Sequence, residues 1–183
     1  MGEQSRISFE FFPTKTDAGH EKLITTATKL ATYNPEFFSC TYGAGGSTRD
    51  RTLNTVLQLD SEIKIPTAPH LSCVGDSKDD LRELLHTYQK SGIKRIVALR
   101  GDLPSGMGMA NGELRYANEL VEFIRNETGD HFYIEVAAYP EMHPQAQDFE
   151  TDLQNFARKV QAGADSAITQ YFFNADCYFY FVE

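Results

Sequence analysis

The sequence predicts an α/β fold of the TIM (β/α)8-barrel type, with about six of the eight β/α units of such a barrel present. Two observations lead to this prediction. Short apolar runs alternate with amphipathic stretches along the 183 residues, which is typical of parallel βαβ units. Polar residues end nearly every apolar run, which favours a ring of strand ends over the single switch point of an open doubly wound sheet.

The expected elements follow one another in a regular order. Apolar runs predict strands within 7–13, 36–46, 67–75, 93–102, 132–141 and 166–173, and amphipathic stretches predict helices at 20–33, 48–62, 77–92, 115–129 and 149–164. Asp17 is a candidate cap of the first helix. Ser77 with Asp80 forms a capping-box pattern, and Gly92 suits a helix end. A complete barrel needs about 250 residues, so we expect 1–183 to form one incomplete barrel domain.

Composition and charge argue against several classes of protein. The 17 basic and 26 acidic residues give a net charge of -9, which is the wrong sign for binding nucleic-acid phosphates. The chain has no signal-peptide pattern and no apolar run approaching ~18 residues, so we expect a cytoplasmic protein without membrane contact. Cys40, Cys73 and Cys177 lack CxxC spacing and a nearby histidine pair, which argues against disulfides and a metal site.

Glu10 is the first candidate catalytic residue. Strand alternation places it on one face with Ser8 and Phe12, among aromatic neighbours. A poorly solvated carboxyl group has a raised pKa and can act as a general acid near neutral pH. The pattern alone slightly favours the alternative, a structural salt bridge from Glu10 to Lys15 or Arg6.

Two further strand ends carry polar residues after apolar runs. Arg100, Gly101 and Asp102 follow the run 96–99, where glycine lets a planar ligand approach and the charged residues can bind its polar groups. The structural alternative is an ordinary ion pair at a strand end. Gln170 stands in an otherwise apolar strand, and its amide can offer both a donor and an acceptor to a heterocycle.

Glycine-rich loops and histidines give weaker signals. The loop 106–112 has GxGxxxG spacing, so we interpret it as a mobile loop or lid and not as a dinucleotide fingerprint. The segment 41–47 lacks the lysine of a P-loop and is predicted to be a tight turn. His70 and His143 could be ligands or bases, although lone histidines are more often structural.

Six collinear motifs together resemble the methylenetetrahydrofolate reductase family. They cover almost the whole chain in order: FEFFPTK (9–15), TYGAGGSTRDRT (41–52), APHLSC (68–73), ALRGD (98–102), AAYPEMHP (137–144) and KVQAGADSAITQYFF (159–173). The resemblance implies a (β/α)8 barrel that binds FAD at the carboxyl ends of its strands. It also implies reduction of 5,10-methylenetetrahydrofolate to 5-methyltetrahydrofolate by NADH or NADPH, in one-carbon metabolism and methionine supply.

The resemblance also assigns roles to individual residues. Glu10 is similar to the general acid of the family, Asp102 to an aspartate near the flavin and pterin, and Gln170 to a glutamine that binds the folate. The flavin contacts implied are Thr41, His70, Arg100, Gly101, Asp102, Tyr116, Ala117, Ala137, Tyr139, His143, Asp152 and Lys159. Family analogy suggests a homo-oligomer, and the sequence leaves the choice between NADH and NADPH open.

Two alternatives stay open at this point. One is a metal-free TIM-barrel lyase or aldolase, which would normally need a lysine at a strand end for Schiff-base chemistry; none of the six predicted strands ends in lysine. The other is a catalytically inactive barrel fragment that binds flavin weakly. Family members continue through two further strands, so we expect an open barrel with exposed strand edges here.

Overall fold

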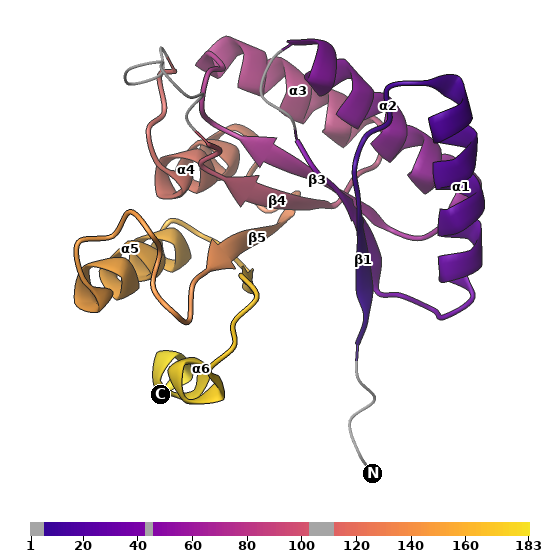
Figure 1. The fold of residues 1–183 in the computed structure, drawn as a ribbon. Helices are drawn as coiled ribbons and strands as arrows, with labels where there is room; N and C mark the ends of the chain where they lie inside the picture. Colours follow the sequence, from indigo (N-terminus) through magenta and orange to yellow (C-terminus); the bar gives the residue numbers. More distant parts are fainter. Residues whose placement is uncertain (1–5, 43–45, 103–111) are drawn as a thin grey trace.

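The computed structural model describes residues 6–42, 46–102 and 112–183, in which six strands alternate with six helices (Figure 1). The strands are β1 (Ser8–Phe11), β2 (Phe37–Cys40), β3 (Thr67–Ser72), β4 (Arg95–Leu99), β5 (Tyr133–Ala138) and β6 (Ser166–Thr169). The helices are α1 (Asp17–Ala31), α2 (Gly46–Ile63), α3 (Lys78–Lys90), α4 (Ala117–Thr128), α5 (Phe149–Gln161) and α6 (Ala175–Val182). The predicted alternation is confirmed, and α6 is an additional helix that the pattern did not predict.

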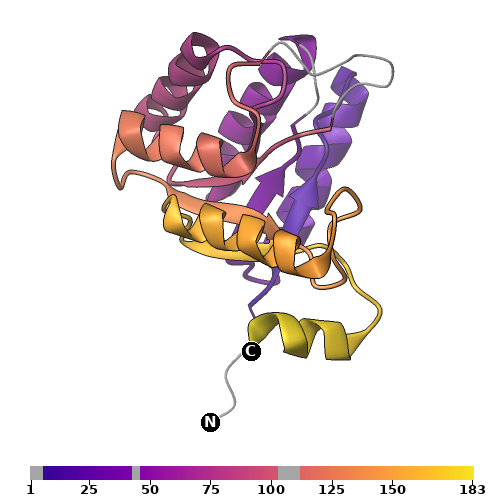
Figure 2. The same ribbon diagram turned by 90° about the vertical axis from the view of Figure 1, so that its left-hand side faces the viewer.

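The strands form one parallel sheet in the order β1-β2-β3-β4-β5-β6. Helices α1 to α5 lie on the outer side of this curved sheet (Figures 1 and 2). Such an order arises when each β/α unit is laid down beside the previous one with the same handedness. The observed architecture is therefore a curled half-barrel, and closure into eight units stays a prediction.

The largest core lies between the sheet and its outer helices. Alternate residues of β3, β4 and β5, such as Leu71, Ile96 and Val136, are buried against helix residues such as Leu85 and Ile124. The other alternate set faces inward, where a smaller buried cluster contains Phe37, Ala68 and Val97, with Leu99 packed against it. Because successive strand residues point to opposite faces, His70, which pairs with Val97 across β3 and β4, shares this inner face with the apolar cluster.

Local capping explains where several helices begin and end. The Thr16 side chain accepts a hydrogen bond from Gly19 N at 3.1 Å, so the predicted cap at Asp17 is wrong by one residue. The capping box of Ser77 and Asp80 is confirmed. Gly92, with φ of 84°, follows α3 as predicted, because a residue in this conformation ends a helix at little steric cost when it is glycine.

The amino ends of the strands are held by an ion network. Arg95, at the start of β4, donates to Glu135 at 2.6 Å and to Glu36 at 2.8 Å. Its guanidinium also lies over the rings of Phe37 and Tyr133, at 4.4 and 4.5 Å from their centroids. Residues of β2, β4 and β5 and of the turn before β2 therefore meet at one arginine, which suits a structural role at this end of a β/α sheet.

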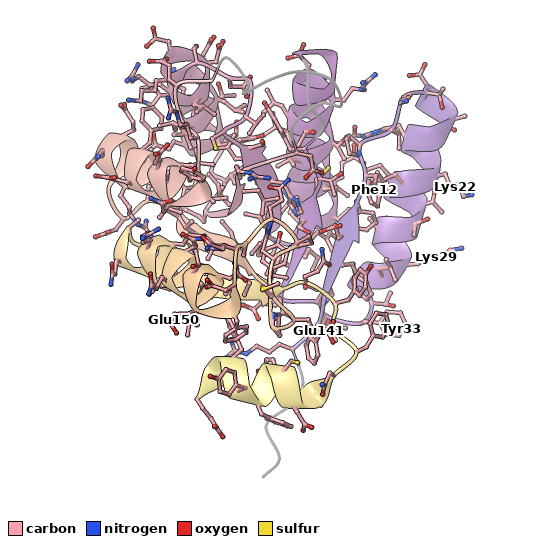
Figure 3. The ribbon with its side chains drawn as sticks, turned by 60° about the vertical axis from the view of Figure 1, so that its left-hand side comes forward. Phe12, Lys22, Lys29, Tyr33, Glu141 and Glu150 are labelled. Carbon is pink, nitrogen blue, oxygen red and sulfur yellow. The ribbon has the colours of Figure 1, made fainter. Side chains whose placement is uncertain are left out.

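The outer surface of the helices is polar. Lys22 and Lys29 of α1 point away from the sheet (Figure 3).

Among the described residues, no helix is long and apolar enough to cross a membrane. In the same part of the chain, no group of three or more His, Cys, Asp or Glu side chains is arranged to hold a metal ion.

Candidate active site

A large pocket of about 870 Å³ lies beyond the carboxyl ends of β3 to β6. This volume lies within the range of small-molecule and cofactor sites. Eleven of the fourteen residues implied by the sequence line it: Arg100, Gly101, Asp102, Tyr116, Ala117, Ala137, Tyr139, His143, Asp152, Lys159 and Gln170. The other three lie elsewhere: Glu10 is on β1, Thr41 directly follows β2, and His70 is on β3.

The turn after β4 forms part of the pocket wall. Gly101 has φ of 88°, a conformation that favours glycine. A Cβ atom added to Gly101 would lie 1.9 Å from Ser72 Oγ, so no side chain fits here without displacing Ser72. Glycine therefore lets this turn pack closely against the end of β3, while Arg100 and Asp102 on either side of it line the pocket.

Helix α5 supplies a charged wall. Lys159 Nζ donates to the carbonyl of Ala137, and burial lowers the pKa of Lys159 while the Asp152 carboxylate opposes that shift. Asp152 in turn accepts a hydrogen bond from the backbone N–H of His143 at 2.9 Å. Asp152 at the start of α5 therefore holds the loop after β5, and Lys159 in the last turn of the same helix lines the pocket.

His143 and Tyr139 offer neutral hydrogen-bonding groups. Burial lowers the pKa of His143, and its Nδ1 accepts from Gln145 N at 3.0 Å. A neutral ring in this arrangement carries its proton on Nε2, from which it can donate. The pKa of Tyr139 is raised by burial and then by Asp102, so its hydroxyl stays protonated.

Glu10 and His70 form a pair on the inner face. Glu10 Oε2 lies 3.3 Å from His70 Nε2, and Arg6, an alternative partner, lies beside Glu36 instead. Desolvation raises the pKa of Glu10, as predicted, and lowers that of His70 to about 4. Although a nearby carboxylate favours protonated histidine, Glu10 is half exposed while His70 is about nine-tenths buried, so desolvation dominates for the histidine.

The contact between these two residues is close without being a well-aligned hydrogen bond. Buried His70 Nε2 has no hydrogen-bond partner among the described residues, despite the 3.3 Å distance to Glu10. Buried polar atoms are normally satisfied. The inner face beside Glu10 therefore has an unused hydrogen-bonding position.

Two further predicted residues, Thr41 and Tyr116, lie near the carboxyl ends of the strands. Thr41 continues the ladder after β2, where its N–H donates to Phe11 O at 2.9 Å and its carbonyl accepts from Thr52 Oγ1 at 3.0 Å. Tyr116 is the N-cap residue of α4 and is exposed. Residues 43–45 and 106–111, which include most of the two glycine-rich segments, lie outside the described residues.

The sequence interpretation missed several pocket residues. Asn155 and Arg158 line the pocket from α5, and Arg158 Nη1 donates to Asn155 Oδ1 at 2.7 Å. Asn155 stands three residues after Asp152 and four before Lys159, a spacing that could have revealed a shared helix face. Ser72 and Tyr42 also line the pocket, and their contribution depends on contacts between strands that no local pattern shows.

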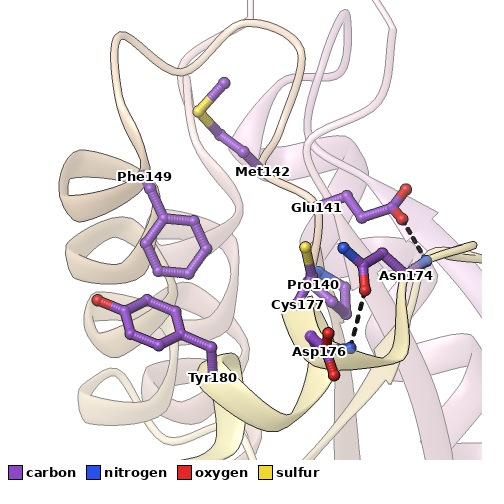
Figure 4. A pocket seen from close by; sticks show the side chains of 8 residues that line it. All are labelled: Pro140, Glu141, Met142, Phe149, Asn174, Asp176, Cys177 and Tyr180. Atoms are coloured by element: carbon purple, nitrogen blue, oxygen red, sulfur yellow. Dashed lines mark hydrogen bonds between the residues drawn. The ribbon is translucent and has the colours of Figure 1, made fainter.

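A second, smaller cavity of about 450 Å³ lies between α5 and α6. Phe149 and Tyr180 face each other there, and Glu141 points toward the start of α6 (Figure 4). Glu141 accepts from Phe173 N and Asn174 N, at 2.9 and 2.7 Å. Its carboxylate thus holds the chain where α6 begins, which favours a structural role.

Comparisons with known proteins agree on one family. A family model described as methylenetetrahydrofolate reductase matches residues 2–183. The 5,10-methylenetetrahydrofolate reductase of Escherichia coli (strain K12) is 43% identical over 178 residues, covering 97% of this chain and 58% of that protein. The Arabidopsis thaliana protein named methylenetetrahydrofolate reductase (NADH) 1 is 38% identical over 98% of this chain and 32% of its own length. The chain thus spans less than two thirds of these relatives.

A solved structure supports the fold alone. The crystal structure of 2,3-dimethylmalate lyase, described as a member of the PEP mutase/isocitrate lyase superfamily, superposes with a TM-score of 0.67 at 10% identity. The match covers 97% of this chain and 63% of that one. At this identity the likeness concerns the curled parallel β/α architecture and carries no information about the reaction.

Proposed function

Because the chain belongs to the methylenetetrahydrofolate reductase family, we propose that it carries flavin- and folate-binding residues of an enzyme that reduces 5,10-methylenetetrahydrofolate to 5-methyltetrahydrofolate. The reductant is NADH or NADPH, and the cofactor is FAD. Residues 1–183 belong to one β/α-barrel catalytic domain in this proposal. The homo-oligomeric state suggested by family analogy and the cytoplasmic location expected from the sequence stay predictions.

One observation carries the proposal: eleven residues implied by sequence resemblance line a single pocket. They come from positions 100 to 170, and the fold brings them together from β4, β5, α4, α5 and the segments that follow the strands. The groups present also fit FAD. Gly101 presents its backbone to the pocket, Arg100 and Lys159 supply positive charge for phosphates, and the Nε2–H of neutral His143 can donate.

When bound, the flavin supplies the transfer of hydride from the nicotinamide to the folate. The residues of the protein bind and orient the flavin and the folate, and they supply the proton that the folate needs. Glu10, whose pKa desolvation raises, is the proposed general acid that delivers a proton to the folate nitrogen that leaves as the ring opens. His70 beside it stays neutral, so it adds no positive charge that would lower the pKa of Glu10.

In this proposal Gln170 orients the folate. Its backbone N–H donates to Ala138 O at 2.7 Å, which extends the β5–β6 ladder, and its side-chain Oε1 accepts from Tyr171 N at 3.0 Å. The second lone pair of that oxygen and the amide NH2 group remain for a ligand. Glu10 lies on β1 and Gln170 directly follows β6, the two outermost strands of the sheet, so the proposal expects the substrate to bridge the space between them.

The lyase alternative has less support. Schiff-base chemistry needs a lysine that can be deprotonated near substrate. Lys159 lines the pocket and has a lowered pKa, but it lies on α5 and donates to Ala137 O. A borohydride-trapped adduct on Lys159 with a carbonyl substrate would favour the lyase, whereas flavin absorption bands in the purified protein would favour the reductase.

The proposal is tested by Glu10→Gln. We expect reduction of bound flavin by nicotinamide to stay within about twofold, and reoxidation by methylenetetrahydrofolate to slow by about 10²–10⁴, because only the second half-reaction needs the proton. Stopped-flow absorbance follows each half-reaction. Glu21→Gln, on the exposed face of α1, is the matched control. Equal losses in both half-reactions would remove the general-acid assignment.

A further inference from the structure

Ser72, the last residue of β3, connects two strand ends at the pocket wall. Its side chain is buried, and its Oγ donates to the carbonyl of Arg100 at 2.9 Å. The N–H of Val74 donates to the same carbonyl at 3.0 Å and lies 3.4 Å from Ser72 Oγ. Ser72 therefore ties the end of β3 to the turn that follows β4.

The same hydroxyl also lies directly behind Gly101. A Cβ on Gly101 would come within 1.9 Å of Ser72 Oγ and 3.1 Å of Ser72 Cβ. The side of the Gly101 backbone where a side chain would project is thus filled by the serine. The position of the hydroxyl determines how far the turn can move away from the pocket.

This turn carries much of the pocket charge. Arg100 and Asp102 line the pocket on either side of Gly101. Both influence the pKa values of Tyr139 and His143 across the pocket. A small rotation of the Arg100–Gly101 peptide would therefore move a guanidinium and a carboxylate relative to any ligand.

We propose that Ser72 is a positioning residue of the flavin site: its hydroxyl fixes the Arg100–Gly101 peptide so that the backbone of Gly101 and the carboxylate of Asp102 meet the flavin ring at a set distance. This inference rests on the proposed function. Ser72 was not among the residues that the sequence resemblance implied, and the structure reveals it through its contacts with the turn.

The hydrogen-bond pattern separates positioning from general stability. The Arg100 carbonyl retains the bond from Val74 N when the serine hydroxyl is removed, so Ser72→Ala leaves no unsatisfied buried carbonyl. Unpaired buried groups are what make such substitutions costly. The overall stability should change little, while the turn gains freedom and the ligand must order it on binding.

The experiment compares Ser72→Ala with Ser61→Ala. Ser61 makes the same kind of bond, from Oγ to the carbonyl of Gln58 at 3.2 Å, on the exposed surface of α2. In flavin-free protein, amide hydrogen exchange at Val74 should accelerate roughly tenfold in Ser72→Ala. The Kd for FAD should rise roughly tenfold. At saturating FAD, the reduction potential should move to a less negative value, because the Asp102 carboxylate is no longer held near the ring.

The possible outcomes are distinct. Unchanged exchange at Val74, or faster exchange with a Kd and potential equal to those of Ser61→Ala, would overturn the positioning role. A raised Kd with an unaltered potential would also overturn it, since general loosening explains that result. If the unmodified protein takes up no FAD, the proposed function fails and the flavin role of Ser72 fails with it, while the exchange rates still report whether Ser72 holds the turn.

Discussion

At the amino end of the sheet, Arg95 is surrounded by partners, whereas at the carboxyl end Arg100 donates to the carbonyl of its own neighbour, Gly101. Arg125, also at the amino end, is surrounded by partners as well. Its guanidinium donates to the carbonyls of Gly129, Phe132 and Gly163 and to the Asp165 carboxylate. Arg95 and Arg125 are thus paired within the protein. At the carboxyl end, Arg100 and Asp102 border a large pocket.

This difference separates residues that hold the fold from residues that can act on a ligand. A buried ion pair is stabilising only while both partners remain. A charged group beside a pocket costs the fold less to change, and its effect should appear in ligand binding instead. Substitutions of charged residues at the two ends should therefore change different measurements: the free energy of unfolding at the amino end and ligand binding at the carboxyl end.

The largest effect is expected for Arg95→Ala. Glu135, which is 3% exposed, would lose its cationic partner and remain buried. Breaking such a pair costs about 3–5 kcal/mol. Urea denaturation should show this loss in the free energy of unfolding. Arg6→Ala, which removes an exposed contact at 3.7 Å from Glu36, should cost less than about 1 kcal/mol; equal losses would contradict the comparison.

A pH effect is expected at the carboxyl end through His70. The unfolded chain binds a proton near pH 6.5, whereas burial holds the folded pKa at about 4, so folded protein is destabilised as the pH falls from about 6.5 to 4. The full loss is about 3 kcal/mol. Unfolding measured at several pH values should be less pH-dependent in His70→Gln; identical slopes would show that His70 is not buried as a neutral ring.

Gly101→Ala should cost about 2–3 kcal/mol in folding free energy, because its Cβ clashes with Ser72 Oγ and the positive φ is strained. Gly75 has a φ of 90° and nothing within 4 Å of an added Cβ. Gly75→Ala should therefore cost about 1 kcal/mol, from the backbone alone. Thermal unfolding and FAD titration measure both variants, and we expect weakened FAD binding in Gly101→Ala alone.

The smallest effect is expected for Asp102→Asn. Removing a carboxylate near the flavin should make the reduction potential less negative by about 20 mV, which corresponds to about 1 kcal/mol for a two-electron couple. The folate half-reaction should slow, and FAD should stay bound. Asp130→Asn, on the loop between α4 and β5, is the control. An unchanged potential, measured by dye equilibration, would place Asp102 away from the ring.

Local patterns predicted much of the fold correctly. The strand and helix order, the capping box of Ser77 and Asp80, and the helix end at Gly92 are confirmed because each depends on neighbours within a few residues. The same reasoning misplaced the cap at Asp17. It also missed α6, whose aromatic residues contact α5 at the pairs Phe149–Tyr180 and Phe156–Phe181.

The sequence by itself determined which residues stand at strand ends, and through its motifs it determined the family and a set of implied site residues. Only the tertiary structure decided which of these meet. Glu10 lies beside His70 across 60 residues, and Ser72 lies behind Gly101 across 29, because parallel strands bring distant positions into register. Burial then sets their chemistry, since desolvation depends on neighbours that no local pattern records.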